Sequence, residues 1–188
     1  MALLVTPIQA YAGDALLSKP EVRAALDYIK SHEHEQIEEQ IAIAQVPSSP
    51  FHEQKRGEFL KQEFERVGLQ HVEIDPIGNV LGWRPGTSDR ALVIAAHLDT
   101  VFPEATDFTV KRLGTRLNGP GIEDDSRGLA VLIALAEALR PANIHTRRSL
   151  LFVANVGEEG LGNLRGGKYL FEQCPCRDRI DAFISVDG

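Results

Sequence analysis

The chain has 188 residues, of which 43% are hydrophobic and 25% are charged, so it is long enough to bury one sizeable core and has the composition of a globular domain. Its formal net charge is −7 and no cluster of Lys and Arg stands out, which argues against nucleic acid as a partner. The only cysteines, Cys174 and Cys176, are too close in sequence for the usual disulfide geometry, and we expect two ordinary thiols beside a helix end.

The start of the chain leaves the cellular compartment open. Residues 2–12 are apolar and end in a small-x-small pattern, as the tail of a secretory signal does, but they lack a basic region before the apolar run. An apolar arm packed on the domain explains them equally well, so cytoplasmic and exported locations both stay open. No later apolar run is long enough to span a bilayer, and we expect no membrane partner.

The first half of the chain predicts helices followed by a hairpin. Apolar residues recur at three- and four-residue spacing over residues 19–44, which predicts one long helix or two short ones. A further helix is expected over residues 52–67, with Gly68 as its stop. The spacing then changes to two, which predicts that strands over residues 72–75 and 79–83 form a hairpin.

Two continuous apolar runs mark the second half of the chain. Residues 91–96 and 150–156 are bounded by turn residues, and such runs are typical of strands that are buried on both faces of a sheet. The other expected elements are a small ribbon of residues 108–110 and 115–117, helices over residues 129–139 and 168–171, and a strand over residues 182–186. Because strands alternate with helices, the pattern predicts an α/β sheet with helices on both faces.

Acidic and histidine residues stand where these strands run into loops. His97 and Asp99 follow the first buried strand, Glu158 and Glu159 follow the second, and Asp187 ends the last one. Sites in α/β sheets form beyond the carboxyl ends of the strands, so we expect these side chains to converge. Imidazole and carboxylate groups are ligands of zinc and related divalent ions, and a hydrolytic site also needs a carboxylate that takes a proton from water.

Each part of this set also has a purely structural interpretation. Asp124 and Asp125 precede the Ala- and Leu-rich helix, where acidic residues are favoured caps, and one of two such neighbours can cap while the other binds metal. Glu158 and Glu159 are flanked by glycines and can form a solvated turn, or one can bind an ion while the other polarises water. Asp99 suits the acceptor that fixes the imidazole ring of a metal-binding histidine.

Taken together, these segments resemble the M20 family of metallopeptidases, which are exopeptidases and aminoacyl hydrolases with two co-catalytic zinc ions. The segments that carry the resemblance are His97-Leu98-Asp99-Thr100-Val101, Gly119-Pro120-Gly121-Ile122-Glu123-Asp124-Asp125-Ser126-Arg127-Gly128, Gly157-Glu158-Glu159-Gly160-Leu161-Gly162 and Val186-Asp187-Gly188. The resemblance implies a zinc-exopeptidase-like fold, with three α/β/α layers and a mixed, mostly parallel sheet. The M28 aminopeptidase-like group is the nearest alternative, and the segment from His97 to Val101 favours M20.

The resemblance also implies a role for each residue of the set. Asp124 would bridge two metal ions, His97 and Asp187 would complete one site, Glu159 would contribute to the other, Glu158 would be the general base and Asp99 would orient His97. The peptide bond between Asp124 and Asp125 would be cis. Zinc is the expected metal, with cobalt and manganese as alternatives.

For the whole protein, the resemblance implies that residues 1–188 are the amino-terminal portion of a catalytic domain. A lid and dimerisation domain and a carboxyl-terminal catalytic segment with a further His ligand are expected in addition, so the isolated chain is expected to be impaired and the complete protein to be a homodimer. The expected reaction is hydrolysis of a peptide or N-acyl amide bond in a small peptide or N-acyl amino acid. A fragment that binds metal without turnover is a further alternative, whereas the absence of a Gly-x-Ser-x-Gly elbow disfavours a serine hydrolase.

Overall fold

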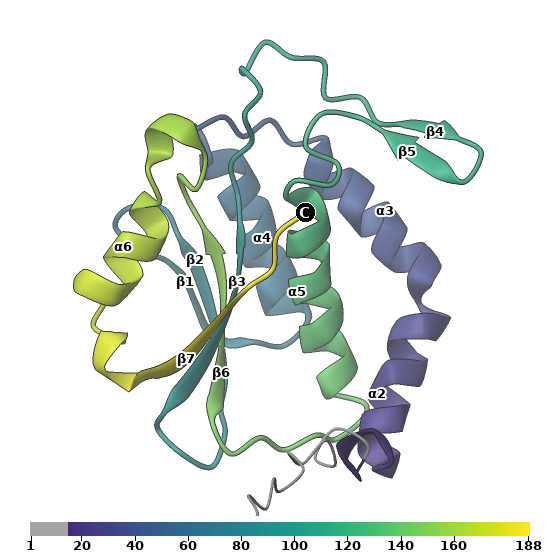
Figure 1. The fold of residues 1–188 in the computed structure, drawn as a ribbon, viewed down its shortest axis with the longest axis vertical. Coiled ribbons are helices and arrows are strands. Elements are labelled where there is room, and N and C mark those ends of the chain that lie inside the picture. The colour runs from purple at the N-terminus through teal and green to yellow at the C-terminus, as the bar shows by residue number, and fades with distance from the viewer. Residues whose placement is uncertain (1–14) are drawn as a thin grey trace, which may run out of the picture.

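A computed structural model describes residues 15–188, and its main feature is a five-stranded sheet in the order β1-β2-β6-β3-β7 (Figure 1). The strands are β1 (Gln70–Ile74), β2 (Val80–Arg84), β3 (Ala91–His97), β6 (Ser149–Asn155) and β7 (Ile180–Ser185). The signal-like residues 2–12 lie outside the described residues. Within residues 15–188 the structure has no helix of sufficient length and apolar character to cross a membrane.

The sheet is mixed rather than mostly parallel. Strand β3 pairs in parallel with both β6 and β7, whereas β2 pairs antiparallel with both β1 and β6. The α/β architecture is as expected, but the predominance of parallel pairing is confirmed only in part. The difference arises because β1 and β2 are joined by a tight turn, which permits only antiparallel pairing, and β2 then joins the sheet beside β6.

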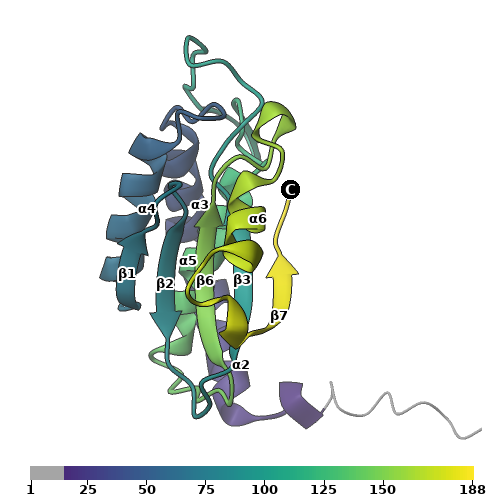
Figure 2. The same cartoon turned by 90° about the vertical axis from the view of Figure 1, so that its left-hand side faces the viewer.

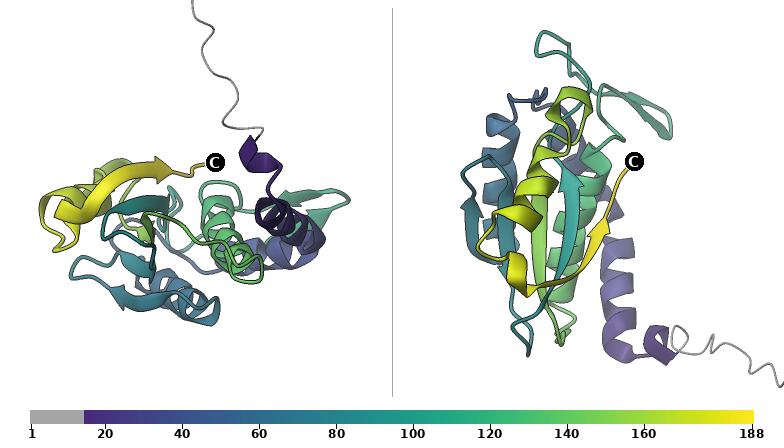
Figure 3. Two further views of the ribbon diagram at one scale, coloured as in Figure 1. Left: turned by 90° about the horizontal axis from the view of Figure 1, so that it is seen from below. Right: turned by 60° about the vertical axis from the view of Figure 1, so that its left-hand side comes forward.

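Helices cover both faces of this sheet. Helices α4 (Gln54–Arg66) and α5 (Ser126–Leu139) lie on one face and α6 (Arg165–Glu172) lies on the other (Figure 2). Helices α2 (Pro20–Ser31) and α3 (Glu33–Ala44) pack on α5, which lies between them and the sheet (Figure 3, left). The three-layer arrangement is therefore confirmed.

The two central strands separate the hydrophobic core into two clusters. Along β3, Ile94 packs in the cluster beneath α4 and α5, and Val93 packs in the cluster beneath α6. On β6, Phe152 is fully buried and packs edge-on against Phe64 of α4, with 6.4 Å between the ring centroids. This burial on both faces accounts for the unbroken apolar runs, and it holds the carboxyl ends of β3 and β6 side by side.

A small ribbon of β4 (Lys111–Leu113) and β5 (Arg116–Asn118) stands apart from the main sheet (Figure 1). The ribbon was expected, but its first strand lies beyond residues 108–110, where we predicted it. The reason is the tight turn at Gly114, whose φ of 64° is readily adopted by glycine and which pairs Leu113 with Arg116.

The expectation of two free thiols is wrong. Cys174 and Cys176 form a disulfide in the buried cluster beneath α6. The chain turns sharply after α6 and enters the short helix η2 (Arg177–Arg179), so the two Cα atoms lie 5.1 Å apart, which is within the range that a disulfide spans.

Candidate metal centre

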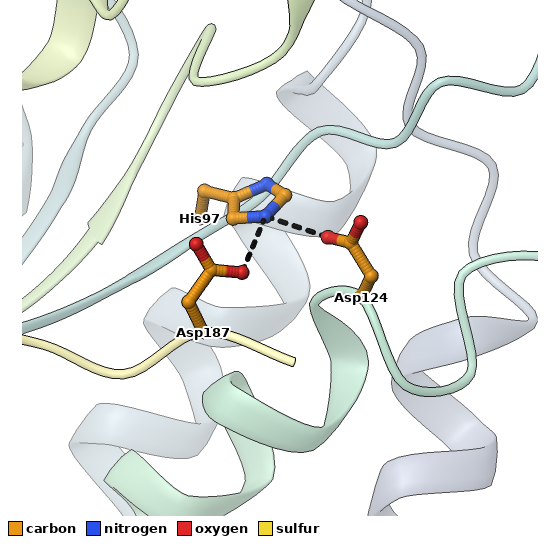
Figure 4. Close-up of side chains that lie close together, drawn as sticks. All are labelled: His97, Asp124 and Asp187. Carbon is orange, nitrogen blue, oxygen red and sulfur yellow. Dashed lines mark hydrogen bonds and ion pairs between the residues drawn. The ribbon is translucent and has the colours of Figure 1, made fainter.

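Three of the expected metal ligands meet at the carboxyl ends of the strands. His97 is the last residue of β3, Asp187 follows β7, and Asp124 lies just before α5, which begins beside the end of β7 (Figure 3, right). The Nε2 atom of His97 lies 2.9 Å from Oδ1 of Asp124 and 3.9 Å from Oδ1 of Asp187 (Figure 4). His97 is buried, whereas the two carboxylates are half exposed, so the cluster opens toward solvent.

Glu158 and Glu159 approach the same imidazole from the end of β6. One atom each of His97, Glu158 and Glu159 lie within 4.8 Å of one another, as do those of His97, Asp124 and Asp187. Within residues 15–188 no such group of three joins Asp124 with Glu159, and the two groups share His97 instead. The bridging role of Asp124 therefore stays a prediction.

Asp99 acts mainly on the backbone of the two glutamates. Its carboxylate is fully buried and accepts hydrogen bonds from the N–H groups of Glu158 and Glu159, at 2.9 Å each. Its Oδ1 atom lies 3.6 Å from Nδ1 of His97, which is ion-pair range and longer than a hydrogen bond. Asp99 thus links the end of β3 to the loop that follows β6.

Asp125 caps α5, so that its neighbour Asp124 is not needed for capping. Its side chain accepts the N–H of Gly128 at 2.9 Å, which caps α5, and its other oxygen accepts the backbone N–H of His97 at 2.9 Å. The peptide bond between Asp124 and Asp125 is cis, as the resemblance implied. Asp124 is left free of capping and faces the imidazole of His97.

The acidic surroundings change the proton affinities in the cluster. Burial acts to lower the pKa of His97, but Asp99 beside its ring and the charges of Asp125 and Asp124 outweigh this and raise the pKa to about 9. Burial raises the pKa of Asp125 to about 7, and burial together with the charge of Asp124 raises the pKa of Glu159. Burial is the larger cause of both shifts, and the negative charge of Asp124 adds to it at Glu159.

The donor set fits a divalent cation. Imidazole nitrogen and carboxylate oxygen are the ligands that zinc and similar ions take, and a cation would offset the charges of the carboxylates that surround His97. The buried Nδ1 atom of His97 has no hydrogen-bond partner among the described residues. In metal sites the second nitrogen of a ligating histidine commonly donates to a carboxylate, and the nearest carboxylate here is that of Asp99.

The sequence did not predict the residues that fix the glutamate loop, which is the segment after β6 that contains Glu158 and Glu159. Asn79 is fully buried, accepts the N–H of Val156 at 3.0 Å and donates to the carbonyl of Gly166 at 3.2 Å. Arg165 forms an ion pair with the buried Glu53, at 2.8 Å from both carboxylate oxygens. The chain on either side of Glu158 and Glu159 is thereby fixed by contacts that no spacing in the sequence indicated.

The sequence also did not reveal Arg56, because nothing in the pattern distinguishes it from an ordinary charged residue of a helix. Its side chain is fully buried below the turn that follows β3. Its Nη1 atom donates to the carbonyl of Leu98 at 2.9 Å, and Nε and Nη2 donate to the carbonyl of Val46 at 3.0 and 2.6 Å. A guanidinium group therefore supports the peptide bond between Leu98 and Asp99, in the turn that joins the expected site residues His97 and Asp99.

A cavity of about 380 Å³ borders Glu158 on the side away from α5. Its other walls include the apolar side chains of Leu164, Phe171 and Phe183. The cavity provides apolar space directly beside the carboxylate that we expect to act as a base.

Comparison with known proteins identifies the family. The family model of peptidase family M28 matches residues 79–188, which is more than half of the chain and contains every residue of the cluster. The chain belongs to peptidase family M28. The M28 group was the alternative that the sequence left open, so membership of a peptidase family is confirmed, whereas M20, the first choice, is not confirmed.

The relatives of this M28 chain are longer proteins. It is 30% identical over 141 residues to the uncharacterized protein YgeY of Escherichia coli strain K12. The matched region covers 70% of this chain and 34% of YgeY. It is 27% identical over 136 residues to carboxypeptidase G2 of Pseudomonas sp. strain RS-16, which covers 68% of this chain and 32% of that enzyme. The M28 chain thus spans about a third of the length of these relatives.

Solved structures share the fold. The aminopeptidase PepT of Bacillus cereus ATCC 10987 superposes with a TM-score of 0.67 at 24% identity and covers 82% of this chain and 43% of PepT. At this identity the similarity establishes the α/β exopeptidase-type fold of the M28 chain and nothing further.

Proposed function

We propose that this chain carries the metal-binding part of a metal-dependent peptidase that cleaves a peptide or N-acyl amide bond in a small substrate by means of water. The observation that carries the proposal is the convergence of His97, Asp124 and Asp187, with Glu158 and Glu159 at the same imidazole. Membership of a peptidase family supports the reaction class. The names of carboxypeptidase G2 and of aminopeptidase PepT support an exopeptidase, and the proposal covers cleavage from either end.

In this proposal His97, Asp124 and Asp187 hold one divalent ion, and Glu159 contributes to a second one. Zinc is the expected metal, with cobalt and manganese as alternatives. Such ions, when bound, polarise the scissile carbonyl and make water more acidic. Asp99 supports this arrangement because it fixes the amides of both glutamates while lying beside the ring of His97.

Glu158 is the residue that we propose as general base. Its carboxylate takes a proton from water as the water oxygen forms a bond to the substrate carbonyl carbon. It then gives the proton to the amine nitrogen as the carbon–nitrogen bond breaks, so that the amine leaves neutral and Glu158 is again a carboxylate. The hydrogen bond from its own N–H to Asp99 holds its backbone in place through both transfers.

Within this enzyme class we further propose an M20-like arrangement. The segment from His97 to Val101 supports it, since its spacing of histidine and aspartate matches that family. In this proposal residues 1–188 form the amino-terminal portion of the catalytic domain, and a lid and dimerisation domain and a further His ligand belong to the complete enzyme. The share of the relatives that the chain covers, about a third, is consistent with it.

The decisive experiment compares Glu158→Gln with wild type in the complete enzyme. After loading with Zn²⁺, the variant is expected to hold as much metal as wild type, and its turnover of dipeptides and N-acyl amino acids is expected to fall by about 10²–10⁴-fold. The exposed Glu73→Gln is the matched control and should behave as wild type. Activity retained in Glu158→Gln would remove this residue from the role of base, and a wild-type protein that takes up no metal would contradict the proposal as a whole.

A further inference from the structure

Arg56 is a permanently charged side chain in a position that normally excludes charge. It lies in α4 with none of its surface exposed, and burying a charged group is costly unless its hydrogen bonds and its charge are both compensated. Among the described residues it has no carboxylate within ion-pair distance, and its donors go to the carbonyls of Leu98 and Val46. The role of this buried guanidinium should therefore follow from the backbone segments to which its two carbonyl acceptors belong.

The carbonyl of Leu98 belongs to the peptide bond between Leu98 and Asp99. The N–H of Leu98 belongs to the peptide bond between His97 and Leu98, and it donates to the carbonyl of Asn155 at 2.7 Å. Both peptides around Leu98 are therefore held, one by β6 and the other by Arg56. Because the direction of a side chain follows the orientation of its backbone, these two bonds set where His97 and Asp99 point.

The charge of Arg56 acts on the buried acids of the cluster. Asp99 and Asp125 are both fully buried, and they are the carboxylates whose charges bear on this guanidinium. Burial lowers the pKa of Arg56 to about 10 despite these acids, so the group stays charged at neutral pH. Asp99 and Asp125 in turn accept the amide hydrogen bonds that hold Glu158, Glu159 and His97, so the guanidinium lies beside the groups that fix the cluster.

We infer that Arg56 is a positioning residue of the metal centre, which aims His97 and Asp99 through its hydrogen bond to the carbonyl of Leu98. The inference rests on the proposed metal-dependent function. Arg56 touches neither the expected ligand atoms nor a substrate, and its effect is transmitted through the backbone of the turn.

The test compares Arg56→Gln and Arg56→Lys with the control Arg66→Gln, a partly exposed arginine of the same helix that pairs with Glu39, Glu63 and Glu137. Co²⁺ is titrated into the metal-free chain and followed by its visible absorption spectrum. Arg56→Gln is expected to bind Co²⁺ about 10–100-fold more weakly, as is typical when a residue that supports a metal ligand is removed. Arg56→Lys keeps the charge but not the planar guanidinium, so its Co²⁺ affinity should lie between those of wild type and Arg56→Gln. Arg66→Gln should bind Co²⁺ as wild type does and lose only thermal stability.

Amide hydrogen exchange on the metal-free proteins provides a readout that does not depend on metal. The amides of Leu98, Thr100 and Glu158 should exchange faster in the Arg56 variants, while amides elsewhere in the sheet keep their wild-type rates. A folded Arg56→Gln with wild-type Co²⁺ affinity, spectrum and exchange would overturn the inference. If Arg56→Gln does not fold, Arg56→Lys decides in the same way.

The failure of the proposed function is distinguishable from the failure of this inference. A wild-type protein that binds no Co²⁺ contradicts the metal-dependent function, and the exchange data then judge the inference. Faster exchange confined to the turn after β3 and the glutamate loop supports a positioning role, and exchange that rises uniformly over the sheet overturns it.

Discussion

Replacing Asp99 by asparagine removes a charge from the centre of the site with almost no change in shape. The carboxylate accepts two backbone N–H bonds, and hydrogen bonds to a charged group each contribute about 1.5–3 kcal/mol. Asparagine keeps one acceptor oxygen but turns an NH₂ group toward the second amide, so one bond is lost and the other becomes neutral. We expect Asp99→Asn to lower the free energy of unfolding by about 3 kcal/mol, which corresponds to a fall in melting temperature of about 6–12 °C for a chain of this size.

The assay is urea unfolding of the metal-free chain at pH 7, followed by circular dichroism. Asp178→Asn is the control, because the side chain of Asp178 is 89% exposed and its replacement should change the unfolding free energy by less than about 0.5 kcal/mol. An Asp99→Asn variant that also stays within about 0.5 kcal/mol of wild type would refute the argument that this carboxylate holds the glutamate loop.

The difference in unfolding free energy between wild type and Asp99→Asn should depend on pH, in a direction that follows from the pKa of Asp99. Burial acts to raise the pKa of Asp99, but the ion pair with His97 and the two amide bonds outweigh it and lower the pKa below the ordinary value of 3.8. The folded state therefore binds this proton less readily than the unfolded state, so the stabilisation is complete above pH 3.8 and is lost as the pH falls through the lower folded-state value. The difference between wild type and Asp99→Asn should be constant near neutrality and shrink in acid.

Three further predictions concern the core, the brace and the metal. Phe64→Ala should lower the unfolding free energy by about 3–5 kcal/mol in urea, because it leaves a cavity against Phe152; a loss below about 1 kcal/mol would contradict that packing. Asn79→Ala should cost about 2–4 kcal/mol in the same assay, since it leaves the buried N–H of Val156 without an acceptor, and unchanged stability would show that the brace is dispensable. Zn²⁺ at a hundred times its dissociation constant should stabilise the chain by about 2.7 kcal/mol in thermal unfolding, reversibly with EDTA, and His97→Ala should abolish the shift; a shift that persists in His97→Ala would place the metal elsewhere.

The hydrophobic pattern predicted the centre of the sheet better than its edges. The runs at residues 91–96 and 150–156 correspond to β3 and β6, because a strand buried on both faces needs apolar residues at every position. The same pattern contains no information on which strand β2 joins, so the antiparallel pairing with β6 was not foreseen. Nor does it contain the register of the ribbon, which depends on the turn at Gly114.

The candidate site was predictable where it follows from strand ends and not where it depends on burial. His97, Glu158 and Asp187 were expected to converge because parallel strands end at one edge of a sheet, and Glu158 and Asp187 each lie near His97, in two separate groups. Arg56 and Asn79 were missed because their contacts are with backbone groups of distant segments, and neither residue type nor spacing reveals such contacts. The same holds for the disulfide, which depends on a local turn of the chain.

The cluster at the strand ends is assembled from segments that are far apart in the chain. His97 ends β3, Asp124 precedes α5, and Asp187 follows β7. During synthesis on the ribosome, a growing chain would present these groups one after another and could not enclose an ion between them until β7 had joined the sheet. Capture of the proposed ion would then have to wait until β7 has been synthesised, and a nascent chain that stalled before that strand would lack the assembled cluster.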